Sequence, residues 1–114
     1  MSVKLNVRQV GDVSVLDAVG RITLGEGSSI FRDTLRDLVT KGNKNILLNL
    51  GEVSYIDSSG IGELVSGFTT VTNHGGRLKL LNLSKRVQDL LQITKLYTVF
   101  EVHDDEAAAI RSFA

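Results

Sequence analysis

The chain has 114 residues and a mass of 12.4 kDa, and 42% of its residues are hydrophobic. This length and composition suit one compact domain with a buried core and argue against a disordered chain. Thirteen basic residues balance thirteen acidic ones, which disfavours a general binder of nucleic acid or of an anionic membrane. There is no cysteine, so disulfides, thiol nucleophiles and cysteine metal sites are excluded.

The sequence shows no targeting segment. Its first residues alternate between apolar and polar types and lack the continuous apolar stretch of a signal peptide. The longest uninterrupted aliphatic run, at residues 46–48, is far shorter than a membrane span. No proline, repeat or low-complexity stretch marks a boundary. We therefore expect a soluble, cytoplasmic protein that forms a single domain over residues 1–114.

The first twenty residues predict a β-hairpin. Val3, Leu5 and Val7 alternate with polar neighbours, as in a half-buried strand. The dipeptide Gly11-Asp12 then separates this run from a second apolar run at residues 13–19. Two such runs around a short glycine-containing turn indicate two antiparallel strands.

A loop and then a helix are expected next. Residues 20–27 are predicted to form a loop of a length that often has a function. The helix is predicted to begin at Ser28 or Ser29 and to end at Lys41-Gly42, with a cation in its last turn and a glycine after it. Its apolar face comprises Ile30, Phe31, Leu35, Leu38 and Val39.

The middle of the chain predicts a central strand followed by the most regular helix. Residues 45–50 carry apolar side chains on both faces, which is typical of a strand covered on two sides. Gly75-Gly76 ends the helix that follows. Its apolar stripe comprises Ile61, Leu64, Val65, Phe68 and Val71, of which we assign Leu64, Val65 and Phe68 to the core.

The last third repeats this alternation. A short strand at residues 78–81 precedes a helix capped by Ser84, and a fifth strand is expected near residues 98–102. Acidic residues at 104–106 open a final helix. The element order is therefore β-β-α-β-α-β-α-β-α. It predicts an α/β fold with a mostly parallel sheet, an N-terminal antiparallel hairpin and about four covering helices.

The segment between the central strand and the regular helix carries the strongest functional signal. Ligands and partners of open α/β sheets meet the protein beyond the carboxyl ends of the strands. Asp57, Ser58 and Ser59 lie there, at a helix start with unpaired N–H groups and a positive dipole. Gly60 and Gly62 each cost up to about 1 kcal/mol relative to alanine in a helix. They indicate that another group approaches the backbone closely.

Three interpretations of this segment remain open from the residues alone. Asp57 or Ser58 caps the helix, a serine hydroxyl accepts a phosphoryl group, or free N–H groups hold a ligand phosphate. The third is disfavoured because the Asp57 carboxylate repels an anion.

The residues Tyr-Ile-Asp-Ser-Ser-Gly-Ile-Gly, at positions 55–62, resemble the signature of the STAS domain, specifically that of bacterial anti-sigma-factor antagonists. Residues 46–53 and 74–80 resemble the family's strands on either side of the signature helix. The order of elements is similar over essentially the whole chain. The motif and the order together are specific, whereas Asp-Ser-Ser-Gly by itself is a weak signal.

The resemblance implies a switch protein without catalysis or a cofactor of its own. In that family the unphosphorylated domain binds an anti-sigma factor that is also a serine kinase, and so releases a sigma factor. The kinase phosphorylates the serine after the motif aspartate, which is Ser58 here, and phosphorylation abolishes binding. A separate protein phosphatase reverses the modification. Ser59 is a weaker candidate for phosphorylation. The resemblance implies no direct binding of nucleic acid or membrane.

One departure from the family's pattern affects the expected surface. Relatives commonly carry an acidic residue in the loop after the second strand. This chain has Thr23 and Leu24 there, with Glu26 slightly later. We therefore expect the partner surface or the rate of phosphorylation to differ. The residues expected to contact the partner are Tyr55, Asp57, Ser58, Ser59, Gly60, Ile61, Gly62, Glu63 and Ser66.

Several competing functions find little support. His74 lies about 24 Å from Ser58 along the helix, so it is no base for a serine nucleophile. His103, Asp104 and Asp105 are adjacent in sequence, whereas metal ligands are spaced on one face. The locally basic residues 77–95 are interpreted as a solvated face. A subunit of a larger stress-sensing or transport assembly, or a sensor of nucleotides or small anions, remains the alternative function.

Overall fold

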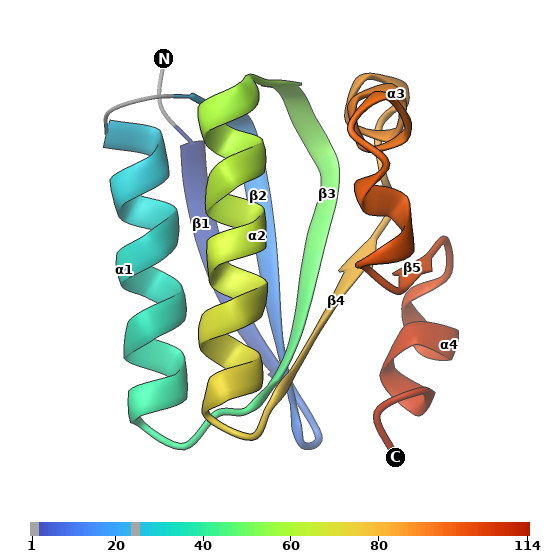
Figure 1. The fold of residues 1–114 in the computed structure, drawn as a ribbon. Helices are drawn as coiled ribbons and strands as arrows, with labels where there is room; N and C mark the ends of the chain where they lie inside the picture. Colours follow the sequence, from blue (N-terminus) through green and yellow to red (C-terminus); the bar gives the residue numbers. More distant parts are fainter. Residues whose placement is uncertain (1–2, 24–25) are drawn as a thin grey trace.

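A five-stranded sheet with the order β1-β2-β3-β4-β5 forms the centre of the molecule (Figure 1). The computed structural model describes residues 3–23 and 26–114. The first two strands are antiparallel and all other neighbours are parallel, which confirms the predicted α/β class with its N-terminal hairpin. The strands are β1 (Val3–Val10), β2 (Val13–Ile22), β3 (Asn45–Ile56), β4 (Arg77–Leu81) and β5 (Val102–His103).

The helices cover the two faces of the sheet unequally. The long helices α1 and α2 run side by side on one face, and the short helix α4 lies on the other (Figure 1). Side chains of α3 belong to the same core cluster as those of α1 and α2. The bounds are α1 (Glu26–Thr40), α2 (Ser58–Asn73), α3 (Lys85–Ile93), the 3₁₀-helix η1 (Leu96–Thr98) and α4 (Glu106–Arg111).

Strand β3 has apolar side chains on both faces because both faces are buried. Ile46, Leu48 and Leu50 belong to the large core cluster with α1, α2 and α3. Leu47 instead joins a smaller cluster with Ala109 of α4 and its neighbours. The alternation of side chains along a strand distributes these residues between the two clusters, as the apolar run predicted.

The end of β2 and the start of α1 differ from prediction. Strand β2 continues to Ile22, which pairs with Ile56 of β3, and α1 already begins at Glu26. The predicted loop at residues 20–27 is therefore largely strand and helix, and neither Ser28 nor Ser29 caps α1. Residues 20–22 show no alternation of apolar and polar side chains that would predict a strand. They are nevertheless strand, because pairing with β3 provides hydrogen bonds for their backbone groups. Leu24 and the side chains of residues 26–28 lie outside the described part.

Strand β3 also extends beyond the predicted residue 50. Its register with β2 shifts twice, near Asp17/Val19 and Gly20/Arg21. Val53 and Ile56 therefore both reach the large core, although they are three positions apart and strict alternation would place them on opposite faces. Such irregularities break the simple alternation that sequence analysis relies on. Near the C-terminus, the expected strand at 98–102 is mostly η1 and a loop, and β5 comprises only Val102–His103.

None of the helices in residues 3–23 and 26–114 is both long enough and apolar enough to cross a membrane.

A polar network on the α4 side of the sheet joins four elements. Arg8 of β1 contacts Asp17 of β2 (Nε–Oδ2, 2.6 Å) and Glu106 of α4 (Nη2–Oε1, 2.8 Å). Asn49 of β3 donates from Nδ2 to Asp17 Oδ1 at 2.9 Å. The Arg8 hydrogen bond, more than that of Asn49, lowers the pKa of Asp17 below its ordinary value.

This network is expected to make the protein less stable in acid. A lowered folded-state pKa stabilises the fold above the unfolded-state pKa of about 3.9, and this contribution disappears as the pH falls through the folded-state value. Asp17→Asn should therefore reduce the loss of unfolding free energy between about pH 5 and pH 3, measured by urea titration. Asp33→Asn, at an exposed position of α1, is the control. An equal change in both variants would contradict the prediction.

Candidate functional site

The turn between β3 and α2 lies where β2 and β3 end. The backbone N–H of Asp57 reaches the carbonyl of Ile22 (3.4 Å), at the last residue of β2. Asp57 has extended backbone angles, and its Oδ1 accepts a hydrogen bond from the N–H of Gly60 at 2.8 Å. Asp57 is therefore the N-cap of α2, one of the two capping residues that the sequence allowed.

Ser58 is the exposed first residue of α2. Its hydroxyl forms no hydrogen bond with any residue that the structure describes, so it is accessible to a modifying enzyme. Ser59 is half-buried, which makes it the less accessible of the two hydroxyls. Both residues lie in the first turn, where free N–H groups and the helix dipole favour negative charge.

The two glycines of this turn have different surroundings. A Cβ atom on Gly60 would lie 2.3 Å from the carbonyl oxygen of Ile22 and 2.6 Å from Cγ1 of Ile56. The group that approaches Gly60 closely is thus the end of β2 in the same chain. A Cβ atom on Gly62 would meet nothing within 4 Å, so the surface there is open.

Two of the expected partner contacts are buried. Gly60 is buried, and Ile61 is only 6% exposed and packs in the large core. Ile61 begins the apolar stripe of α2, so helical spacing could have placed it in the core and not on the outer surface. This finding corrects the expectation for Gly60 and Ile61 and leaves Ser58, Gly62 and Ser66 as the exposed members of the set.

Glu63 lies on the α1 side of the candidate surface. Its carboxylate contacts Arg32 of α1 (Oε2–Nη1, 3.2 Å), and its side chain is 18% exposed. Ser66 lies about one turn further along α2, and it lines a small groove between the two helices together with Glu63 and the same Arg32. The candidate surface therefore extends from the Ser58 turn towards α1.

Sequence analysis missed a cluster of cations around Tyr55. The guanidinium carbon Cζ of Arg21 lies 5.0 Å from the centre of the Tyr55 ring, and that of Arg86 lies 4.7 Å away. Arg21 and Tyr55 are register partners on β2 and β3, whereas Arg86 belongs to the first turn of α3. No local pattern signals this cluster, because its members meet only through strand pairing and helix packing.

The two histidines are used elsewhere. His74 is the C-cap of α2, at the end of the helix opposite Ser58, and its Nδ1 contacts the carbonyl of Thr70 (2.8 Å). His103 contacts the Glu101 carboxylate through Nε2 at 2.6 Å. This hydrogen bond and a weaker one from Lys79 lower the pKa of Glu101. Neither histidine serves Ser58 as a base.

Metal binding gains no support at residues 103–105. Asp105 caps α4 by accepting a hydrogen bond from the N–H of Ala108 at 3.0 Å. Within the described part of the chain, His, Asp and Glu form no group of three that could hold a metal ion.

The basic stretch of residues 77–95 is not simply a solvated face, which corrects that interpretation. Lys79 is only 7% exposed. Its Nζ donates to the carbonyl and hydroxyl oxygens of Ser112, each at 2.9 Å, and lies 4.6 Å from the centre of the Phe113 ring. Arg77 also contacts Phe113. These cations therefore anchor the residues after α4 to the sheet.

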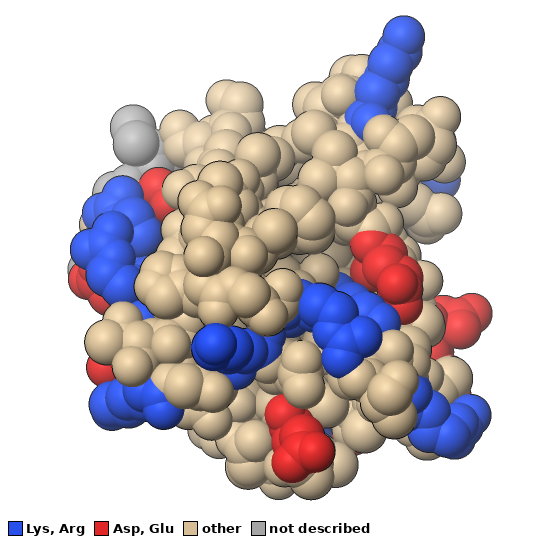
Figure 2. Space-filling model, turned by 60° about the horizontal axis from the view of Figure 1, so that its bottom comes forward, with Lys and Arg blue, Asp and Glu red and all other residues tan. Residues whose placement is uncertain are grey.

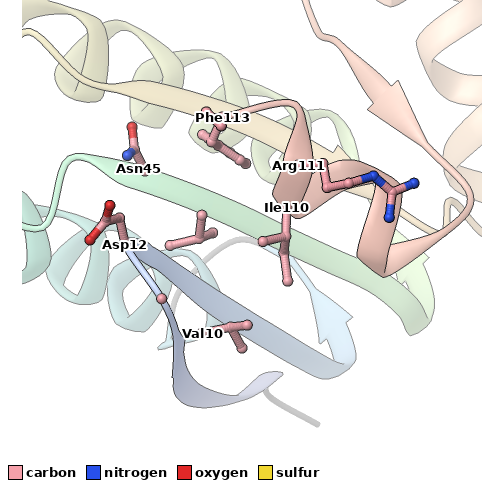
Figure 3. A pocket seen from close by; sticks show the side chains of 9 residues that line it. Val10, Asp12, Asn45, Ile110, Arg111 and Phe113 are labelled. Carbon is pink, nitrogen blue, oxygen red and sulfur yellow. The ribbon is translucent and has the colours of Figure 1, made fainter.

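The amino-terminal ends of the parallel strands lie at the end of the sheet opposite the Ser58 turn. Basic and acidic side chains both lie at this end, amid uncharged surface (Figure 2). A cavity of about 280 Å³ opens at this end, between the β1–β2 turn, the start of β3 and the C-terminal residues (Figure 3). Its lining includes Val10, Asp12, Asn45, Ile110, Arg111 and Phe113. The cavity is thus at the opposite end of the sheet from Ser58.

Comparison with known proteins agrees with this architecture. The family model of the STAS domain matches residues 4–109. The anti-sigma-B factor antagonist of Bacillus subtilis is 32% identical over 90% of this chain and 92% of its own length. The crystal structure of the Thermotoga maritima protein TM1081 has a TM-score of 0.88 at 24% identity, over 96% of this chain and 93% of that chain.

The fold is also that of the Bacillus protein SpoIIAA, whose structure is known in a phosphorylated form. The TM-score is 0.76 at 21% identity, over 97% of this chain and 100% of that chain. The family match covers nearly every described element, from β1 to α4. This chain therefore belongs to the STAS domain family.

Proposed function

We propose that this protein is an anti-sigma factor antagonist, and that phosphorylation of Ser58 controls its binding to an anti-sigma factor. The exposed position of Ser58, directly after the capping Asp57 and at the carboxyl edge of the sheet, carries the proposal. The similarity to the Bacillus subtilis antagonist supports the general role. The phosphorylated form of SpoIIAA supports a role for phosphorylation in a protein of the same fold.

The chemistry of the turn is consistent with such a switch. A phosphoryl group adds a charge of about −1.5 to −2 near neutral pH. On Ser58 it would lie next to the Asp57 carboxylate, so a closely packed partner would meet two neighbouring negative groups. Like charges brought together in an interface penalise association. The N-terminal dipole of α2 favours negative charge at this position, so the fold itself tolerates the modification.

The proposed partners follow from this role. The unphosphorylated protein binds an anti-sigma factor with serine kinase activity and thereby releases a sigma factor in the cytoplasm. The kinase transfers the γ-phosphoryl group of ATP to the Ser58 hydroxyl, and a protein phosphatase removes it by hydrolysis. The protein itself is a binding regulator and not an enzyme. Its contact surface comprises Tyr55, Asp57, Ser58, Ser59, Gly62, Glu63 and Ser66.

The test is phosphorylation in a lysate of the source cells. The purified protein is incubated with ATP and lysate, recovered through an affinity tag, and measured by intact-mass spectrometry. The wild type should gain one phosphoryl group, Ser58→Ala should gain none, and Ser59→Ala should behave as the wild type. Proteins that the Ser58→Ala variant retains are then identified and assayed for serine kinase activity.

Two results would contradict the proposal. Phosphorylation of the Ser58→Ala protein at an unchanged level would exclude Ser58 as the acceptor. Absence of phosphorylation in all variants, together with recovery of transport or stress-sensing subunits and no kinase, would instead favour a STAS subunit of a larger assembly.

A further inference from the structure

We propose that Arg21 and Arg86, held by the ring of Tyr55, form a binding site for a carboxylate-bearing segment of a protein partner. The ends of β2 and β3 and the first turn of α3 supply the three residues. We call them the Arg–Tyr–Arg cluster. The inference deepens the proposed function, on which it rests for the identity of the partner, because it states the chemistry that this partner must present.

The structure holds both guanidinium groups against one aromatic ring. Their Cζ atoms lie 5.0 Å and 4.7 Å from the same ring centre, so they are no farther apart than the sum of these distances. Both arginines are exposed, while Tyr55 is half-buried. The β2–β3 register places Arg21 beside Tyr55, and the Ser84 cap defines the start of the helix that carries Arg86.

Within the part of the chain that the structure describes, no carboxylate neutralises either arginine. Among the described residues, Arg21 and Arg86 form no ion pair and no hydrogen bond through their side chains. Other cations of this protein do: Arg8 contacts two carboxylates, and Arg32 contacts Glu63. The cluster therefore brings together two positive charges whose mutual repulsion is offset by no carboxylate that the structure describes.

The aromatic ring leaves the hydrogen-bonding capacity of both arginines available. A π face attracts a cation electrostatically and consumes none of the five N–H donors of a guanidinium group. Holding the side chain on a ring also limits the conformational freedom that is lost on binding. Guanidinium groups bind carboxylates with two parallel hydrogen bonds. The cluster thus presents preorganised donors for side chains of Glu or Asp.

Its location connects the cluster with Ser58. Tyr55 precedes Ser58 by three residues, a distance that an extended chain spans in about 11 Å at most. An acidic segment bound to the cluster would therefore lie against the Ser58 turn. A phosphoryl group on Ser58 would repel that segment. The acidic segment is therefore the part of the partner on which the proposed switch would act.

The test uses a defined peptide and the intact protein. An acetylated peptide of alternating Glu and Gly residues is titrated at low salt into ¹⁵N-labelled protein, and a peptide with Gln in place of Glu is the control. The side-chain Nε–H signals of Arg21 and Arg86 should shift with the Glu peptide and not with the Gln peptide. Arg21→Gln/Arg86→Gln should weaken binding of the Glu peptide by at least about fivefold.

A matched double variant separates the cluster from general basic charge. Arg36→Gln/Arg111→Gln removes two exposed arginines from α1 and α4, and it should bind the Glu peptide as the wild type does. Equal weakening in both double variants, or equal shifts with both peptides, would overturn the proposal. Shifts of both Nε–H signals in Ser58→Glu without peptide would also overturn the proposal, because the cluster would then bind the negative group at position 58 of the same chain and not a partner.

This experiment does not depend on phosphorylation. If Ser58 is never modified but the Glu peptide binds the cluster, the proposed switch is wrong and the carboxylate site stands. If Ser58 is phosphorylated but the peptide does not bind, only the carboxylate site is wrong.

Discussion

A Ser58→Glu protein is expected to bind its anti-sigma factor about 100-fold more weakly than the wild type, with its fold unchanged. Glutamate places a negative charge at the exposed first position of α2, next to the Asp57 carboxylate. Two neighbouring negative groups in a desolvated interface penalise association. In the free protein the same charge is favourable at a helix N-terminus. The affinity is measured by isothermal titration calorimetry with the kinase identified by capture.

The control for this variant is Thr69→Glu. Thr69 is exposed on the same helix, about three turns and 16 Å from Ser58. Its replacement by glutamate adds the same charge outside the first turn. It should leave the affinity within about threefold of the wild-type value. Undiminished binding by Ser58→Glu, or loss of its folded circular-dichroism spectrum, would show that position 58 is not a control point of the kind proposed.

Replacing Gly60 by alanine is expected to lower the free energy of unfolding by roughly 2–3 kcal/mol. The new Cβ atom would lie 2.3 Å from the carbonyl oxygen of Ile22. That oxygen belongs to the backbone of a paired strand and cannot rotate away as a side chain would. Either the end of β2 or the first turn of α2 must move. The free energy of unfolding is measured by urea titration.

Gly62→Ala is the matched control for Gly60→Ala. The substitution is the same and lies in the same helix, but a Cβ atom at position 62 meets nothing within 4 Å. It should leave the stability unchanged or raise it by up to about 1 kcal/mol, because alanine favours helix more than glycine does. Similar stability of the two variants would contradict the close approach of β2 to Gly60. A loss of partner binding confined to Gly62→Ala would support an open contact surface there.

The two glycines show which features of the site can be predicted from the sequence and which cannot. Their presence in a first turn indicated a close approach to the backbone, and this is correct for Gly60. The sequence contains no indication that the approaching group is the end of β2, because Ile22 lies far from Gly60 along the chain. For the same reason, sequence analysis left Ile61 among the surface contacts, although its helical spacing already favoured the core.

Features that depend on neighbours along the chain could be predicted from the amino-acid sequence. The Gly11-Asp12 turn, the apolar stripe of α2 and the caps at Asp57 and Ser84 all follow from periodicity and local hydrogen bonding, and the structure confirms them. The order of the elements and the resemblance carried by residues 55–62 led to the STAS domain, which the family match confirms.

Contacts between residues far apart in the sequence depend instead on the three-dimensional packing of the elements. Pairing with β3 extended β2 to Ile22, packing of the C-terminal residues buried Lys79, and strand register with helix packing brought Arg21 and Arg86 to Tyr55. Local propensity does not encode these contacts. Each depends on the free energy of hydrogen bonds and apolar burial shared between segments that are far apart in sequence.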